Sequence, residues 1–297
     1  MFVRRCSLAL AALTLAACST DPASPVADGS ALRPDAAPSF ALAAGNNTVI
    51  VTGADVTPQI HNTPWTGASW TLYTRDGGTG TFVAGPGTAP MGVGSLQLAT
   101  PLNNDKAYLF NYDHRNTPLA AITAISYATF RTAGNAEQVA ALNVEVDVNG
   151  AAEGGYTVLV FEPVYNTTQG TVQSGIWQPW NAIAGGQARW WSSRAIPGVC
   201  AFDCFVTWDA IKAANPNAVI TGGFGVNQGG GNPALTTAVD VLTLGYGGNS
   251  ITYDFEPYVS ATTRAACKDG GWQTVKRADG SAFANQGDCV SYVENGR

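Results

Sequence analysis

The sequence predicts an all-β protein whose main domain is a β-sandwich of two facing antiparallel sheets. Between residues 47 and 257, short apolar runs are separated by Gly, Asn and Pro, which is typical of a sandwich or barrel rather than of βαβ units. Apolar and polar side chains alternate over residues 142–148, as in a strand with one apolar face. Only 12% of the 297 residues are charged and the net charge is −6, which excludes charge-rich coiled coils and indicates no nucleic-acid partner.

The N-terminal residues indicate export and a lipid anchor. Residues 1–17 combine an arginine pair with a short apolar run and are predicted to be a signal peptide. The residues Leu15-Ala16-Ala17-Cys18 resemble the bacterial lipobox, in which a peptidase cuts before the cysteine and lipid is attached to it. We expect lipidation of Cys18 and a place in the cell envelope, at the outer membrane or cell surface. An ordinary secretory signal is the alternative.

Residues 18–45 are predicted to be a disordered tether, because Ala, Pro, Ser and Asp dominate and few large apolar side chains are present. The sandwich domain is predicted to span residues 46–258. Its further strand candidates are rich in β-branched and aromatic residues and lie at 108–112, 121–130, 156–161, 218–221, 239–244 and 251–255. One short helix is expected at residues 208–214, with Thr207 as its cap and Pro216 ending it.

Four cysteines remain once the signal peptide is removed and Cys18 carries lipid: Cys200, Cys204, Cys267 and Cys289. An even number in an exported protein favours disulfides, and of three possible pairings the local ones need the fewest assumptions. Zinc is the alternative, but neither His61 nor His114 lies near these cysteines in sequence. Residues 259–297 are therefore predicted to be a small, disulfide-stapled C-terminal segment. A short helix carrying Cys289 and Val290 is expected to pack near Trp272.

Several turn and strand motifs resemble jelly-roll modules of secreted and surface bacterial proteins, which are related in architecture to concanavalin-like and carbohydrate-binding sandwiches. These motifs are Gly85-Pro86-Gly87-Thr88, residues 92–96, 207–216, 229–232 and 239–240, and Tyr253-Asp254-Phe255-Glu256-Pro257. The resemblance implies a jelly roll whose last strand returns beside the first. The cysteine-bracketed end, residues 267–293, resembles a C-terminal tail that recurs in exported bacterial proteins. This resemblance implies no activity.

The strongest catalytic candidates are Glu145 and Asp147. Laminarinase-like glycoside hydrolases place a nucleophile, a helper aspartate and a general acid on alternate residues of one strand, and the pair resembles the first two of these. The third position falls on Asn149 or Gly150, so the general acid is missing from the pattern. A polysaccharide hydrolase is therefore the alternative function. No cofactor or metal site is expected, with structural calcium left open because oxygen ligands such as Asp240 and Asp254 are plentiful.

Binding is the function that the sequence favours. Trp177, Trp180, Trp190 and Trp191 lie close together in sequence, and indole rings suit the apolar face of a sugar. Burial of these rings in the core is the alternative for each of them. Asn143, Glu145 and Asp147 are expected on a wet strand face beside them. We therefore expect a noncatalytic module that binds a glycan or another envelope polymer. A structural or adhesive envelope protein is the remaining possibility.

Overall fold

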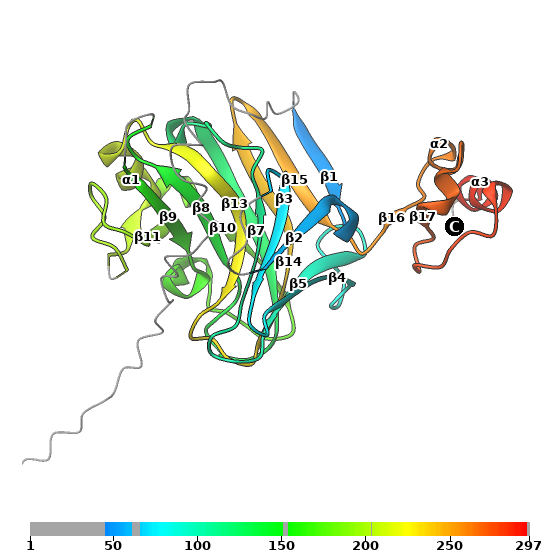
Figure 1. Ribbon diagram of the computed structural model, residues 1–297, viewed down its shortest axis with the longest axis horizontal. Helices are drawn as coiled ribbons and strands as arrows, with labels where there is room; N and C mark the ends of the chain where they lie inside the picture. Colours follow the sequence, from blue (N-terminus) through cyan, green and yellow to red (C-terminus); the bar gives the residue numbers. More distant parts are fainter. Residues whose placement is uncertain (1–44, 61–65, 151–153, 203, 296–297) are drawn as a thin grey trace, which may run out of the picture.

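The computed structural model describes residues 45–60, 66–150, 154–202 and 204–295. The described chain is mostly β, with two sheets packed as a sandwich and three short helices (Figure 1). The predictions for Cys18, for the signal peptide and for nearly all of the tether fall on residues outside these ranges. No helix in the described ranges is both long and apolar enough to cross a membrane.

The first sheet has seven strands arranged around the long strand β14 (Leu235–Tyr246). One edge of β14 pairs with β5 (Gly94–Thr100) through residues 235–239 and with β15 (Asn249–Phe255) through residues 242–246. Its other edge pairs with β7 (Ile122–Ala133). The remaining strands lie further out: β4 (Thr79–Ala84) beside β5, β10 (Trp177–Asn181) beside β7, and β1 (Asn46–Val51) beside β15.

The second sheet has eight strands, and we give them in spatial order: β12 (Val206–Thr207), β11 (Arg189–Ser192), β9 (Tyr156–Phe161), β8 (Ala141–Asp147), β13 (Val219–Gly229), β6 (Lys106–Asn111), β3 (Trp70–Arg75) and β2 (Val56–Ile60). Most neighbours are antiparallel. However, β2 pairs with β3 in parallel, as β1 does with β15 in the first sheet. Both sheets are therefore mixed, and the prediction of purely antiparallel sheets is wrong at these two pairs. The prediction that the first and last strands lie together is confirmed.

A hydrophobic core fills the space between the sheets. Leu142, Val144 and Val146 of β8 are buried in it, so the predicted alternation of this strand is confirmed. Leu244 and Phe255 reach the same core from the seven-stranded sheet. Burying each such side chain contributes roughly 1.5 to 3 kcal/mol, which is why the alternating pattern fixes which face of each strand turns inward.

The predicted helix is present as α1 (Trp208–Ala214), and the Thr207 side chain accepts a hydrogen bond from the Ala210 amide at its start. Two further helices, α2 (Arg264–Cys267) and α3 (Gln286–Glu294), lie in the C-terminal segment. The expected short helix around Cys289 is thus confirmed. The sandwich contains the one helix predicted for it, and α2 is the helix that was not predicted.

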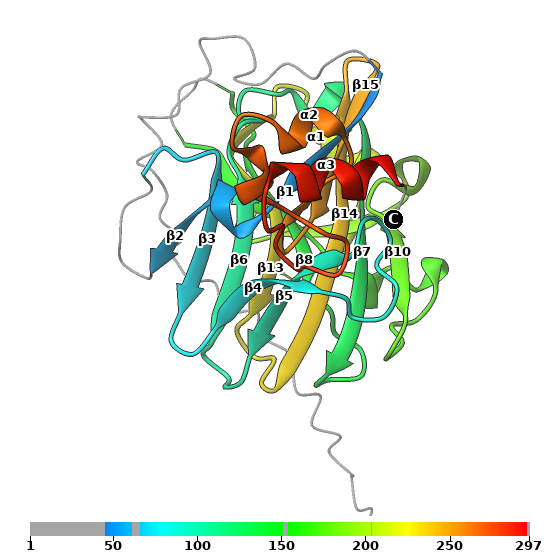
Figure 2. The same cartoon turned by 90° about the vertical axis from the view of Figure 1, so that its right-hand side faces the viewer.

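The C-terminal segment forms a small unit of its own beside the sandwich, as Figures 1 and 2 show. Its two-residue strands β16 (Val259–Ser260) and β17 (Val275–Lys276) pair in parallel. A disulfide joins Cys267 of α2 to Cys289 of α3. A separate apolar cluster surrounds this bond and includes Trp272, Val290 and Phe283. The other local pair, Cys200 and Cys204, is also bonded, so both predicted disulfides are present.

Candidate ligand-binding surface

The face of the eight-stranded sheet that points away from the core, here called the outer face, carries an unusual number of polar and aromatic side chains. Because successive residues of a strand point to opposite faces, the neighbours of the core residues lie on it. They include Tyr73, Tyr108, Phe110, Asn143, Glu145, Tyr156, Trp191 and Phe205. The predicted residues Asn143, Glu145 and Asp147 thus share this face, as expected.

An aromatic row crosses β3 and β6 on the outer face. The Tyr73 and Tyr108 rings stack with centroids 4.6 Å apart, and Tyr108 stacks on Phe110 at 4.3 Å. The Lys106 ammonium lies 6.0 Å from the centre of the Tyr108 ring. Since the faces of these buried rings contact one another, the row stabilises the sheet rather than offering a flat platform. The alternate aromatic residues of β6 are the sequence signal that could have revealed it.

Glu145 is held at the centre of the outer face by two hydrogen bonds. Its Oε2 accepts from the Gly223 amide at 2.6 Å, and its Oε1 accepts from the Tyr156 hydroxyl at 3.0 Å. The amide is free to donate because the register between β13 and β8 shifts between Ile220 and Phe224. A side chain at Gly222 would collide with the Glu145 carboxyl group. The two glycines therefore make room for this carboxyl and bind it.

Burial raises the pKa of Glu145, although the hydrogen bonds from Gly223 and Tyr156 act in the opposite direction. Only 6% of the residue is exposed. Asn143 is 8% exposed, and its Oδ1 accepts no hydrogen bond from the described residues. Asp147 is partly exposed, and its Oδ1 accepts from the Asn149 amide at 2.8 Å. The face expected to be wet is thus buried at Asn143 and Glu145 and open only toward Asp147.

The structure does not bring the four predicted tryptophans together. Trp180 and Trp190 are buried in the core, where their Nε1 atoms donate to Thr129 Oγ1 and to the Ala182 carbonyl, both at 2.8 Å. Trp191 is buried on the outer face. Trp177 lies on β10 in the other sheet and is half-buried. The alternative of core burial thus applies to Trp180 and Trp190, so a single tryptophan groove is not formed.

A pocket of about 550 Å³ opens where the outer face meets its β12 edge. We call it the edge pocket, and its lining residues are Tyr165, Asn166, Thr167, Thr168, Gln187, Arg189, Phe205 and Thr207. The rings of Tyr165 and Phe205 pack with centroids 4.0 Å apart. Tyr165 is 37% exposed, so part of an aromatic surface faces solvent here. None of these residues was predicted to bind a ligand from the sequence, where only Thr207 was named, as the cap of the predicted helix.

Asn166 ties the loop that forms one wall of the edge pocket to strand β11. Its Nδ2 donates to the Arg189 carbonyl at 2.9 Å, and its Oδ1 accepts from the Arg189 amide at 2.7 Å. Nδ2 also donates to the Glu162 carbonyl at 3.0 Å. Because this side chain makes the two bonds that a neighbouring strand would make, it extends the sheet past the end of β9. The pocket wall is therefore fixed to the sheet.

Within the described ranges, no three His, Cys, Asp or Glu side chains are grouped so as to hold a metal ion. The chain matches no known family model and none of the curated proteins.

Proposed function

We propose that this chain is a noncatalytic jelly-roll module that binds carbohydrate at the bacterial cell envelope, where lipid on Cys18 holds it. The single observation that carries the proposal is the edge pocket. Its volume of about 550 Å³ lies within the range of small-molecule sites. An exposed aromatic surface beside hydroxyl and amide groups suits a sugar, because sugars combine apolar ring faces with hydroxyls.

The edge pocket also has polar groups in its lining. Thr167 and Thr168 lie on the loop that Asn166 ties down, and Gln187 precedes β11. Hydroxyl and amide groups both donate and accept hydrogen bonds, as sugar hydroxyls do. A pocket whose wall is fixed before the ligand arrives loses less entropy on binding.

Retention on polysaccharides tests the binding proposal. The chain from residue 18 onward, with Cys18→Ala to keep it soluble, is passed over a panel of immobilised neutral and acidic polysaccharides. We expect retention on at least one of them and its loss in Tyr165→Ala. Leu102→Ala is the matched control, because Leu102 is an exposed apolar side chain (68% exposed) outside the pocket. Absence of retention on the whole panel would contradict the proposal and favour a structural or adhesive role.

The same incubation tests the alternative, a hydrolase that acts through Glu145. The raised pKa of this buried carboxyl is the feature that favours a general acid. Its two oxygens, however, already accept hydrogen bonds from Gly223 and Tyr156, which supports a positioning role. We expect no release of reducing ends. Release that disappears in Glu145→Gln would make the protein an enzyme.

The anchor is tested separately by metabolic labelling with a radioactive fatty acid. We expect the full chain to incorporate the label in a bacterial host and Cys18→Ala to lose it. Label that persists in the variant would show that the lipid is not on Cys18.

A further inference from the structure

We propose that the edge pocket recognises an acidic sugar and that Arg189 binds the sugar's carboxylate. This inference rests on the proposed carbohydrate-binding function and names the class of glycan. Arg189 is the only charged residue among those that line the pocket. The side chain is exposed, and no described acidic side chain forms an ion pair with it.

A cation that pairs with no acid of the described ranges stands out in the edge pocket against the charge of the whole chain, which has 21 acidic and 15 basic residues. The acidic side chain Asp209 follows the pocket residue Thr207 closely in sequence. Its carboxylate lies 3.1 Å from the Lys212 ammonium, so it is already paired. The pocket thus offers a positive group with no acid in its lining to repel an anionic ligand.

The backbone holds Arg189 in a defined place. Arg189 pairs with Thr207 across β11 and β12, so their side chains leave the sheet on the same face. Its amide and carbonyl both bond to the Asn166 side chain. The backbone of Arg189 is therefore fixed between β12 and the loop that carries Asn166. Only the long side chain has to be ordered when a ligand binds.

The chemistry of the pocket fits a uronic acid better than a neutral sugar. A guanidinium group donates two parallel hydrogen bonds to a carboxylate, and such charge-assisted bonds are stronger than neutral ones. Tyr165 packs on Phe205 in the same pocket but is 37% exposed, and its exposed ring surface suits the apolar face of the sugar ring. A uronic acid carries both a ring face and a carboxylate on the same sugar unit, whereas a neutral hexose carries the ring face without the carboxylate.

Pectin provides matched ligands for the test, because methyl esterification removes the negative charge while the sugar backbone stays the same. The soluble Cys18→Ala chain is titrated with polygalacturonate, with its highly methyl-esterified form, with a sulfated polysaccharide and with a neutral glucan. We expect polygalacturonate to bind at least about 10-fold more tightly than the esterified form, with an affinity that falls as salt rises. The carboxylate geometry should also make it bind more tightly than the sulfated polymer.

The variant Arg189→Gln should remove this difference by lowering affinity for polygalacturonate about 10-fold or more, with little change for the esterified form. Arg264→Gln is the control, since Arg264 lies on α2 and pairs with Glu294 in the C-terminal unit. Equal binding of the two pectins, or discrimination that survives in Arg189→Gln, would overturn the inference but leave carbohydrate binding intact. Tighter binding of the sulfated polymer would also overturn it. Binding of none of the four polymers would count against both proposals.

Discussion

The buried side chain of His114 couples the stability of the sandwich to pH. His114 is 0% exposed, and its Nε2 lies 2.7 Å from the Tyr253 hydroxyl and its Nδ1 3.5 Å from the Tyr246 hydroxyl. Burial lowers the pKa of His114 from 6.5 to about 3. The imidazole therefore stays neutral in the folded protein, whereas in the unfolded chain it binds a proton below about pH 6.5.

We expect this histidine to make the fold weaker in mild acid. The contribution of the neutral imidazole to the free energy of unfolding is fully present above about pH 6.5, the pKa of histidine in the unfolded chain. As pH falls from there toward 3, this contribution decreases by up to about 1.4 kcal/mol per pH unit. The carboxyl of Asp240, whose burial raises its pKa to about 7, has the opposite pH dependence. The useful measurement is therefore a comparison of urea unfolding at pH 7.5 and 5 in the parent and in His114→Gln. The parent should lose more free energy of unfolding between the two pH values, and equal losses would contradict the prediction.

Gly223 shows a steric requirement at the residue scale. A Cβ atom at this position would collide with the Phe110 ring of the neighbouring strand β6. We expect Gly223→Ala to push the aromatic row aside and to lower the free energy of unfolding by about 1 to 3 kcal/mol. Gly53→Ala is the control, because the Cβ added there would have only the Phe82 ring within 4 Å, at 3.7 Å. Urea unfolding of the two variants checks this, and similar small effects would show that the row is not packed against Gly223.

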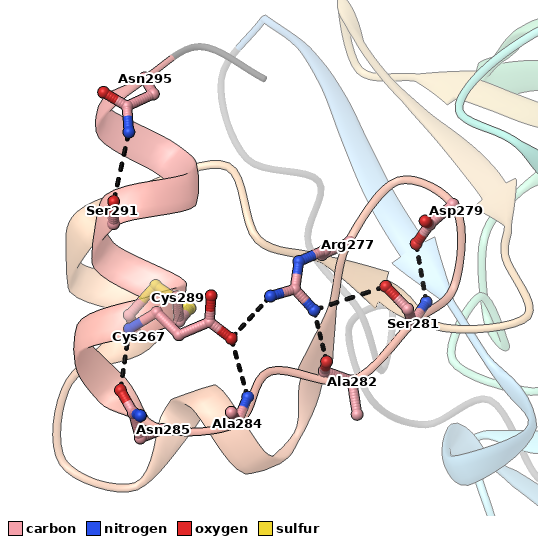
Figure 3. A network of polar contacts seen from close by, with 11 residues as sticks. Cys267, Arg277, Asp279, Ser281, Ala282, Ala284, Asn285, Cys289, Ser291 and Asn295 are labelled. Carbon is pink, nitrogen blue, oxygen red and sulfur yellow. Dashed lines mark hydrogen bonds and ion pairs between the residues drawn. A yellow bond between two sulfur atoms is a disulfide. The ribbon is translucent and has the colours of Figure 1, made fainter.

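At the scale of elements, Arg277 holds the loop of the C-terminal unit against α3. Its guanidinium pairs with Asp288 at 2.6 Å and donates to the Ser281 hydroxyl at 3.4 Å and to the Ala282 carbonyl (Figure 3). It also lies 4.5 Å from the centre of the Phe283 ring. The Ala284 amide also donates to the Asp288 carboxylate, and this bond followed by Arg277 lowers the pKa of Asp288. One planar side chain thus connects four points of the unit.

We expect Arg277→Leu to loosen this loop without affecting the sandwich. Limited proteolysis should cleave the variant between residues 277 and 285 several times faster than the parent. Arg277→Lys keeps the charge but loses the planar guanidinium group, so its cleavage rate should lie between those of the parent and Arg277→Leu. Equal cleavage of Arg277→Leu and the parent would show that the disulfide between Cys267 and Cys289, rather than the arginine, orders the loop.

Elements dominated by local signals were predictable from the sequence. The alternation of residues 142–148 identified β8 and its core face, and the Thr207 cap identified α1. The parallel pairs of β1 with β15 and of β2 with β3 were not predictable, because pairing depends on contacts between segments that are distant in sequence or joined by long loops. The same holds for the edge pocket. Tyr165, Arg189 and Phe205 form it only because Asn166 ties one loop to β11.

At the scale of the whole molecule, the sandwich and the C-terminal unit each have a core of their own. The core between the sheets ends with Phe255, and the unit buries Cys267, Val275 and Cys289 in a separate cluster. Glu256, at the end of β15, belongs to the sandwich because its Oε1 accepts from the Val93 amide at 2.7 Å and the Gly94 amide at 3.0 Å. A boundary just after Tyr258 therefore leaves these two hydrogen bonds intact, whereas the bond from the Tyr258 hydroxyl to the Ala278 carbonyl, at 2.9 Å, crosses it.

We expect deletion of residues 259–297 to leave the free energy of unfolding of the sandwich unchanged within about 0.5 kcal/mol, since no buried sandwich side chain would be removed. Deletion of residues 46–51 is the contrasting variant. It removes β1 with its buried Val51 and exposes the edge of β15, so a loss of about 2 kcal/mol or more is expected. Urea unfolding followed by tryptophan fluorescence measures both, because Trp180, Trp190 and Trp208 lie in the sandwich core. If the C-terminal deletion instead destabilises the protein as much as loss of β1, the unit acts as a cap on the sandwich and the two cores fold as one.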